Sequence, residues 1–243
     1  MPEPAPGPDR LVLVVGTGTE VGKTWVACRL IESLRALGTR VAARKPAQSF
    51  APAAPPGARD AQVLGAASGE PPETVCPPHR WYPVEMAPPM AAEALGSPAF
   101  TVDDLLGELR WPPPTPGGPE LVGVVEVAGG VRSPQASDGD AVDLARRLAP
   151  DVVVVVGDAG LGTINSVRLT TGALKEAWGS GPGRAPAVAV VLNRFDPGAE
   201  LHRRNRQWLG DALGLRVVAV PGGEAELAGC VLAAPAGARG RHG

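Results

Sequence analysis

A glycine-rich segment near the start of the chain has the residue types and spacing of a phosphate-binding loop. The segment reads Gly16-Thr17-Gly18-Thr19-Glu20-Val21-Gly22-Lys23-Thr24, between the apolar run 11–15 and a helical pattern. Glycine permits the tight bends at which several backbone N–H groups reach one phosphate. Lys23 can bring a point charge to the terminal phosphates, and the Thr24 hydroxyl can ligate Mg²⁺. The segment therefore predicts a nucleoside-triphosphate site, with one residue more between Gly16 and Gly22 than in the common pattern.

Further charged residues follow other apolar runs. Lys45 leaves the run 40–44 and can be a solvated surface lysine, but Pro46 fixes its exit and favours a second ammonium that stabilises charge during phosphoryl transfer. Glu126 ends the run 121–125 ahead of Gly129, where a Mg²⁺-nucleotide site requires a carboxylate. Asp60 is a weaker candidate, since a carboxylate at a helix start also stabilises the helix dipole.

Two further segments admit a binding interpretation and a structural one. Residues 161–165 open a helix with small side chains, where free N–H groups can bind a carboxylate, although Thr163 or Asn165 can equally cap the helix. Asn193 can recognise a base edge or hold a turn. The histidines lack partners at ligand spacing, which argues against a metal or triad role for His79, His202 and His242.

These residues require a scaffold of alternating strands and helices. The expected strands are 11–15, 40–44, 121–125, 152–156, 187–192 and 217–220, and the expected helices are 24–37, 60–67, 90–95, 102–109, 140–148, 166–178 and 201–213. A proline-rich stretch, 70–89, is expected as a surface excursion. Continuous apolar strands are typical of a parallel sheet covered on both faces. The pattern predicts a single-domain, doubly wound α/β fold of the P-loop NTPase kind, with ligands beyond the carboxyl ends of the strands.

Composition limits the class of protein. The chain has 243 residues and a formal net charge of −2, which gives no electrostatic basis for binding nucleic acid or an anionic membrane. No apolar run is long enough to span a membrane, residues 1–9 read as a disordered tail, and the three cysteines show no metal spacing. We expect a cytoplasmic protein with one domain over 10–230 and a flexible tail over 231–243.

The ordered motifs together resemble the dethiobiotin synthetase family, with features of its actinobacterial members. The resemblance rests on the extended loop, on Lys45-Pro46 with Ser49, on Val125-Glu126 with Ala128-Gly129-Gly130, on 161–165, and on Leu192-Asn193. It implies that 7,8-diaminononanoate, CO₂ and MgATP give dethiobiotin, ADP and phosphate in biotin synthesis. It also implies a homodimer with each substrate site at the subunit interface.

The same resemblance implies roles for individual residues. Lys23 would hold the phosphates, Lys45 the carbamate intermediate, and Thr24, Asp60 and Glu126 the Mg²⁺. Ser49 would contact the diamine, and Gly162, Thr163, Ile164 and Asn165 its carboxylate. The nucleotide set comprises Glu20, Val21, Gly22, Lys23, Thr24, Trp25, Asp60, Glu126, Gly129, Asn193, Arg194, Ala219, Val220, Pro221 and Glu226.

Two residues depart from the family pattern at the expected site. Val127 and Phe50 each stand where the family has glycine, and both are expected to crowd the pocket. A degenerate homologue that binds nucleotide without carboxylation is therefore one alternative. Others are an amidoligase of the cobyrinate type, which usually carries a further glutaminase domain, and a nucleotide-switched positioning ATPase, which usually has a second lysine early in the loop.

Overall fold

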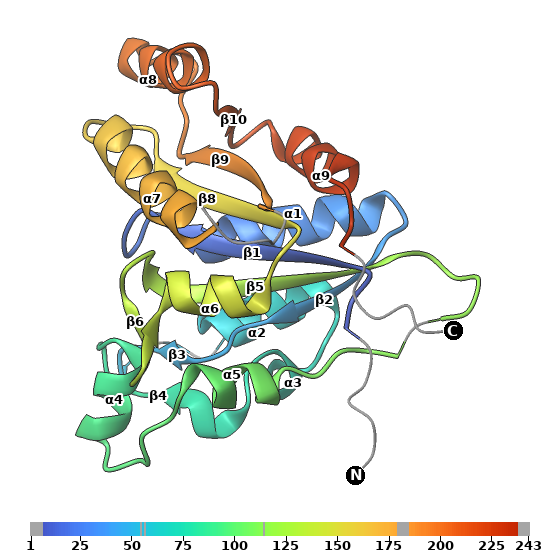
Figure 1. Ribbon diagram of the computed structural model, residues 1–243, viewed down its shortest axis with the longest axis vertical. Coiled ribbons are helices and arrows are strands. Elements are labelled where there is room, and N and C mark those ends of the chain that lie inside the picture. Colours follow the sequence, from blue (N-terminus) through green and yellow to red (C-terminus); the bar gives the residue numbers. More distant parts are fainter. Residues whose placement is uncertain (1–6, 54, 56, 114, 179–184, 238–243) are drawn as a thin grey trace.

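The molecule is built on a parallel sheet with the strand order β10-β9-β8-β1-β5-β2 (Figure 1). It is a computed structural model that describes residues 7–53, 55, 57–113, 115–178 and 185–237. The strands of this sheet are β1 (Arg10–Gly16), β2 (Arg40–Arg44), β5 (Leu121–Gly130), β8 (Val152–Asp158), β9 (Ala187–Asn193) and β10 (Arg216–Ala219). Since β1 pairs with β5 and β8 and not with β2, the predicted doubly wound α/β fold is confirmed.

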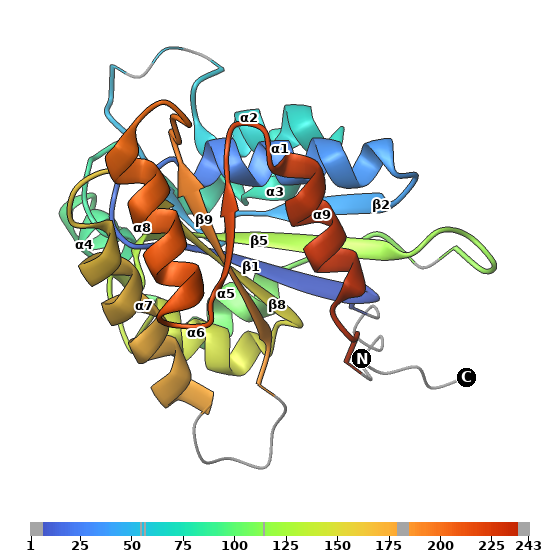
Figure 2. The same cartoon turned by 90° about the horizontal axis from the view of Figure 1, so that it is seen from above.

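Helices cover both faces of the sheet, as Figure 2 shows from above. One hydrophobic cluster contains buried residues of α1 (Lys23–Ala36), α2 (Asp60–Ser68), α3 (Pro72–Val75) and α9 (Glu224–Ala233). The cluster on the opposite face contains buried residues of α4 (Pro88–Ala94), α5 (Val102–Glu108), α6 (Ala141–Leu148), α7 (Thr163–Trp178) and α8 (Glu200–Asp211). The sheet is therefore buried on both sides, as its continuous apolar strands predict.

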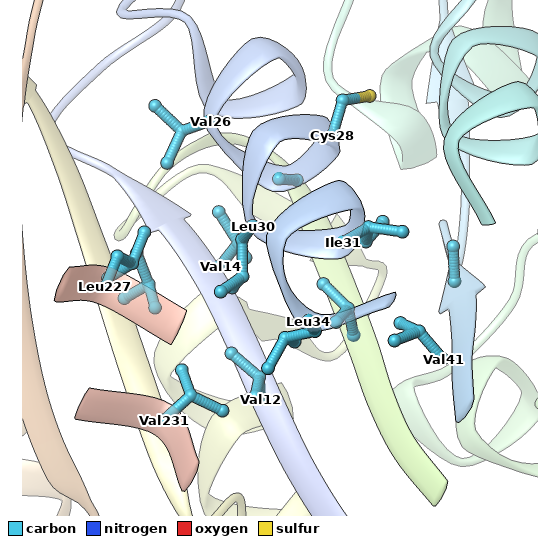
Figure 3. Packing of buried hydrophobic residues seen from close by; sticks show 14 of the residues in the cluster. Val12, Val14, Val26, Cys28, Leu30, Ile31, Leu34, Val41, Leu227 and Val231 are labelled. Atoms are coloured by element: carbon cyan, nitrogen blue, oxygen red, sulfur yellow. The ribbon is translucent and has the colours of Figure 1, made fainter. Parts of the chain in front are cut away.

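The packing of α1 fixes the loop that precedes it. Leu30, Ile31 and Leu34 of α1 are fully buried against Val12 and Val14 of β1 (Figure 3). Burying a side chain of this size stabilises the fold by about 1.5–3 kcal/mol. Because strand and helix are both held in the core, the glycine-rich turn between them has fixed ends.

Two elements differ from their expected bounds by three residues or more, and one helix was not expected at all. β5 continues to Gly130 instead of ending at residue 125, since its later residues still pair with β1. α7 begins at Thr163 instead of residue 166, because Gly162, at φ 90°, makes the turn ahead of it. α9 was not expected, and it carries the packed chain to Ala233, beyond the expected domain end at residue 230, because Val231 is fully buried.

The proline-rich stretch 70–89 is more structured than an extended excursion. It contains α3, a 3₁₀ turn (Pro78–Arg80) and β4 (Trp81–Tyr82), which pairs with β3 (Gln48–Ser49). Val75, Cys76 and Tyr82 are buried because the stretch folds back onto the domain. A small hairpin, β6 (Pro134–Ala136) with β7 (Gly139–Asp140), follows β5. Within the described ranges, no helix has the length and apolarity needed to span a membrane.

Candidate active site

The phosphate loop joins β1 to α1 and depends on glycine at two positions. A Cβ atom at Gly16 would lie 2.7 Å from the Gly18 carbonyl oxygen, and one at Gly22 would lie 2.1 Å from Asn193 Nδ2. Gly22 also has φ 87°, a conformation that side chains disfavour. Lys23 Nζ donates to the Gly18 carbonyl at 3.2 Å, so its ammonium lies against the loop. The first N–H groups of α1 have no partner within the helix and are available to a phosphate.

A lysine, two carboxylates and a hydroxyl meet beside this loop. Lys45 Nζ lies 2.6 Å from Glu126 Oε1 and 2.7 Å from Asp60 Oδ2. The Thr24 hydroxyl lies 2.9 Å from Asp60 Oδ1 and 3.0 Å from Glu126 Oε1, and its single proton serves one of them at a time. One residue each comes from the phosphate loop, the position directly after β2, α2 and β5, so the fold brings together four residues that the sequence singled out.

Burial and mutual attraction set the charges of this cluster. Burial lowers the pKa of Lys23, and the like charge of Lys45 lowers it further. Burial also acts to lower the pKa of Lys45, but Asp60 and Glu126 outweigh it and the pKa is raised. For the acids, burial raises the pKa of Glu126 despite Lys45, whereas attraction to Lys45 overcomes burial and lowers the pKa of Asp60. Glu126 is therefore protonated before Asp60 as the pH falls.

The oxygens of this cluster fit a magnesium ion that arrives with a nucleotide. Mg²⁺ prefers one or two carboxylates, a hydroxyl, waters and phosphate oxygens. Glu126 Oε2 is buried and lacks a hydrogen-bond partner in the part of the chain that the structure describes, so it is free to ligate. Across that same part, no group of three or more His, Cys, Asp or Glu side chains could hold a metal ion. The site therefore suits a cation shared with phosphate and not a metal held by protein alone.

The cluster opens onto a cavity of about 760 Å³, which is large enough for a nucleotide and a small substrate. Ten of the residues given a role in the predicted site line it: Glu20, Gly22, Lys23, Thr24, Lys45, Ser49, Asp60, Glu126, Gly129 and Arg194. The Ser49 hydroxyl is buried and, among the described residues, has no partner. Three cationic side chains thus line the cavity together with a free hydroxyl.

Two residues at the end of β9, Asn193 and the Arg194 that follows it, hold the phosphate loop from the side. Asn193 Nδ2 donates to the Val21 carbonyl at 2.9 Å, and Asn193 itself does not line the cavity. Arg194 donates to the Glu20 carbonyl at 2.8 Å and to Asp158 Oδ2 at 3.0 Å, and it does line the cavity. This bond holds the phosphate loop, and recognition of a base by Asn193 stays a prediction.

The other predicted site residues lie outside this cavity. The base segment Ala219, Val220 and Pro221 adjoins the end of β9 through a bond from Phe195 N–H to the Val220 carbonyl, at 2.9 Å. The side chain of Glu226 lies 3.9 Å from Arg206, and Trp25 is partly exposed beside Arg29. The proposed carboxylate segment, Gly162, Thr163, Ile164 and Asn165, also lies outside, although Thr163 Oγ1 is buried and lacks a partner among the described residues.

The two departures from the family pattern differ in their effect. Val127 does not crowd the cavity, contrary to expectation, because it is fully buried in the hydrophobic cluster on the face opposite Glu126. Neighbouring residues of a strand point to opposite faces, so Glu126 and Val127 cannot both face the ligand. Phe50 does line the cavity, and the Arg59 guanidinium stacks on its ring at 4.4 Å.

Sequence reasoning missed one wall of the cavity. Residues 85–88 form part of the lining, as does Ser133. Ser133 Oγ accepts a hydrogen bond from the Gly130 N–H at 2.8 Å and fixes the turn after β5. Pro88, at the first position of α4, is the signal that could have placed a helix start here.

Comparison with known proteins gives consistent matches. A family described as an AAA domain matches residues 10–222. The ATP-dependent dethiobiotin synthetase BioD of Rhodococcus jostii (strain RHA1) is 36% identical over 228 residues, covering 93% of this chain and 92% of that protein. The protein of the same name from Anaeromyxobacter dehalogenans (strain 2CP-C) is 37% identical over 190 residues, 77% and 78% of the two chains. That from Caulobacter vibrioides (strain NA1000 / CB15N) is 38% identical over 187 residues, 76% and 80%.

Proposed function

Because the chain belongs to the ATP-dependent dethiobiotin synthetase family, we propose that it carboxylates 7,8-diaminononanoate and closes the ring to dethiobiotin at the expense of ATP. The observation that carries this proposal is the position of Lys45. A second ammonium, held 2.6–2.7 Å from two carboxylates beside a phosphate loop, suits transfer of a phosphoryl group to an anionic acceptor.

The proposed reaction has three bond-forming steps. One amine of the substrate adds to CO₂ and loses a proton, which gives a carbamate. A carbamate oxygen then attacks the γ-phosphorus of ATP, and ADP leaves. The second amine attacks the carbonyl carbon of this mixed anhydride, phosphate leaves with its bridging oxygen, and the lost amine proton goes to solvent.

The residues of the cavity divide these tasks. Lys23 and the first N–H groups of α1 bind the phosphates, and Lys45 binds the carbamate and stabilises charge on the transferred group. Ser49 offers its free hydroxyl to the diamine. Thr24, Asp60 and Glu126 would hold Mg²⁺, which neutralises phosphate charge when bound. Asn193, with the segment 219–221 and Glu226, is proposed to border the base.

We also propose that the protein acts as a homodimer. The segment 162–165, proposed to bind the substrate carboxylate, lies outside the cavity of a single chain. Leu161 and Leu169, at the same end of α7, have exposed fractions of 93% and 67%. Apolar side chains exposed beside a binding segment suit a contact with a second copy. Sedimentation of the purified protein tests this, and a monomer at assay concentration would refute it.

The proposed function is tested by measuring ADP release at saturating MgATP. We expect release to require both 7,8-diaminononanoate and bicarbonate, with dethiobiotin formed in equal amount and identified by mass spectrometry. ADP release that ignores either substrate would overturn the proposal.

Phe50 supports a second candidate function, a nucleotide-binding protein that has lost carboxylation, since its ring lines the cavity next to Ser49. Complementation of a biotin-requiring bacterial strain without its own synthetase separates the two candidates. Growth without added biotin excludes this second candidate. In a chain that fails to complement, Phe50→Gly should restore growth if this ring is the obstacle.

A further inference from the structure

The backbone of one wall of the cavity is held by hydrogen bonds to a single carbonyl group. The Tyr82 carbonyl accepts hydrogen bonds from the Phe50 N–H at 3.0 Å and from the Val84 N–H at 2.8 Å, and the Met86 N–H donates to the Val84 carbonyl at 3.0 Å. Ser49, Phe50 and Met86 line the cavity. The position of this wall therefore depends on where β4 holds Tyr82.

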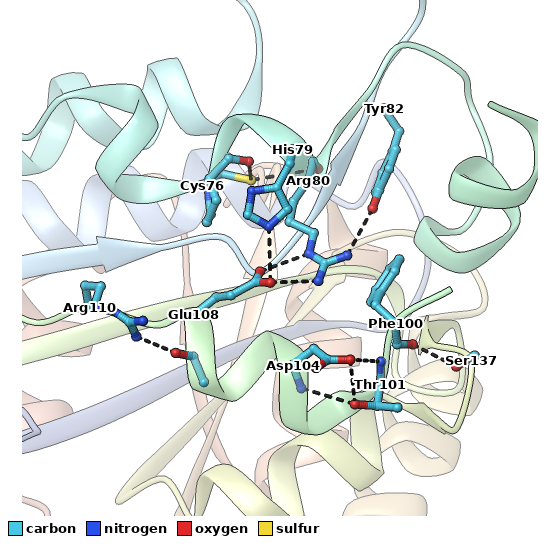
Figure 4. Close-up of polar contacts among 12 residues, drawn as sticks. Cys76, His79, Arg80, Tyr82, Phe100, Thr101, Asp104, Glu108, Arg110 and Ser137 are labelled. Atoms are coloured by element: carbon cyan, nitrogen blue, oxygen red, sulfur yellow. Dashed lines mark hydrogen bonds and ion pairs between the residues drawn. The ribbon is translucent and has the colours of Figure 1, made fainter. Parts of the chain in front are cut away.

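The pairing of β3 with β4 is too short to fix Tyr82 by itself, because it joins two residues to two residues. Side chains supply the support (Figure 4). Glu108 binds Arg80 through two hydrogen bonds, at 2.9 Å to Nε and 2.7 Å to Nη2. The Arg80 guanidinium stacks over Phe100 at 4.1 Å, and the Phe100 ring stacks on the Tyr82 ring at 6.2 Å with an interplanar angle of 11°. Arg80 Nη1 also lies 3.5 Å from the Tyr82 hydroxyl.

The far side of this assembly is itself fixed. Thr101 and Asp104 form a capping box at the start of α5, the helix that ends at Glu108. The Phe100 carbonyl accepts hydrogen bonds from Ser137 Oγ at 2.7 Å and from the Ser137 N–H at 2.9 Å. The contact between Arg80 and Glu108 thus ties β4 to a helix with a fixed start.

We propose that Arg80 and Glu108 are positioning residues for the acceptor substrate, and that they act through Tyr82 on the wall formed by residues 49–50 and 84–86. Neither residue lines the cavity, so neither touches substrate. None of the residues in this wall belongs to the phosphate loop. Loss of the pair therefore weakens binding of the diamine and leaves binding of the nucleotide intact. The effect on the diamine rests on the proposed function.

The test is a steady-state comparison of Glu108→Gln and Arg80→Lys with the wild-type protein. Since a misplacement of about 1 Å can cost on the order of 100-fold, we expect the KM for diaminononanoate to rise roughly tenfold. The KM for MgATP should stay within about twofold, because the wall and the phosphate loop are separate segments. Both substitutions weaken the contact between Arg80 and Glu108, so the double variant should raise the KM by less than the product of the two single effects.

A matched control lies at the other end of the sheet. Arg10 and Glu120 form a similar ion pair at 3.0 Å, with side-chain exposed fractions of 8% and 33% against 9% and 25% for Arg80 and Glu108. Glu120→Gln should lower the Tm by about as much as Glu108→Gln does. It should leave the KM for diaminononanoate and the KM for MgATP unchanged. An unchanged diamine KM in a folded Glu108→Gln protein, or an equal rise in Glu120→Gln, would overturn the inference.

Hydrogen exchange gives a readout that does not depend on turnover. The amides of Phe50 and Val84, which both donate to Tyr82, should exchange at least about tenfold faster in Glu108→Gln and at the wild-type rate in Glu120→Gln. Equal exchange in the two variants overturns the positioning role, whereas a wild-type protein without diamine-dependent ADP release overturns the proposed function. If Glu108→Gln does not fold, Glu108→Asp, which keeps the charge, should give smaller changes in the same direction, and no change refutes the inference.

Discussion

Removing the charge of Lys45 while keeping its volume, in Lys45→Met, tests the electrostatic account of the site. Coulomb's law with an effective dielectric constant of 20 gives about 6 kcal/mol for the attraction between Lys45 and Glu126 at 2.6 Å. The attraction between Lys45 and Asp60 at 2.7 Å is about as large before it is reduced for the greater exposure of Asp60. The cost of burying the lysine offsets much of this. Loss of one partner from a buried ion pair costs about 3–5 kcal/mol, which is the expected decrease in the free energy of unfolding.

The electrostatic account also predicts how the stability of Lys45→Met changes with pH. Burial already raises the pKa of Glu126, and loss of Lys45 raises it further. A carboxyl with a raised pKa in the folded state favours folding at low pH, and this contribution is lost as the pH rises through the unfolded and then the folded pKa. The free energy of unfolding of the variant should therefore fall short of the wild-type value by less at pH 5 than at pH 8. Urea unfolding at these two pH values measures the difference.

The control and an added ion complete this experiment. Lys175 is exposed on α7, and Lys175→Met should leave stability unchanged. Millimolar Mg²⁺ should stabilise Lys45→Met more than the wild-type protein, because Asp60 and Glu126 then face each other without a counter-charge. A loss of stability below about 1 kcal/mol, or a larger deficit at pH 5 than at pH 8, would refute the account.

Three further predictions concern the loop, the core and the thiols. Gly22→Ala places a methyl group against the side-chain amide of Asn193, at a position whose positive φ disfavours a side chain. Calorimetry should therefore detect no binding of an ATP analogue. Val127→Gly should lower the free energy of unfolding by about 2–4 kcal/mol without raising kcat, since it empties a core position outside the cavity. Burial raises the pKa of Cys28 and of Cys76 to about 12. A thiol reagent at pH 8 should therefore modify Cys230 rapidly and the other two only on unfolding, whereas rapid modification of all three would contradict their burial.

The sequence was sufficient to predict the elements that follow local rules. Glycine spacing predicts the phosphate loop, and apolar periodicity predicts α1 and the valine-rich strands. The carboxyl ends of parallel strands must lie at one edge of the sheet. That rule alone brought Lys45 and Glu126 to the loop, where the structure places them.

The remaining features depend on contacts that no local pattern encodes. Val127 is expected in the pocket because it stands where the family has glycine, but β5 continues past residue 125 and the alternation along it turns the Val127 side chain into the core. The ion pair between Arg80 and Glu108 joins a 3₁₀ turn to the last residue of α5, and the two residues are far apart in sequence. The start of α9 at Glu224 was missed because glycine precedes it and recurs inside it.

The strand order also decides when during translation the nucleotide site can form. β1, which leads into the phosphate loop, completes its pairing only with β5 and β8, and Val12 lies opposite Val124 and Val152. A nascent chain has already made the loop and α1 long before either neighbouring strand leaves the ribosome. Until then both edges of β1 present unpaired backbone N–H and C=O groups, between apolar side chains, to other chains. The phosphate loop, the earliest segment of the site, thus gains its full support only after β8 has been synthesised, and the ligand can protect only a chain that extends beyond β8.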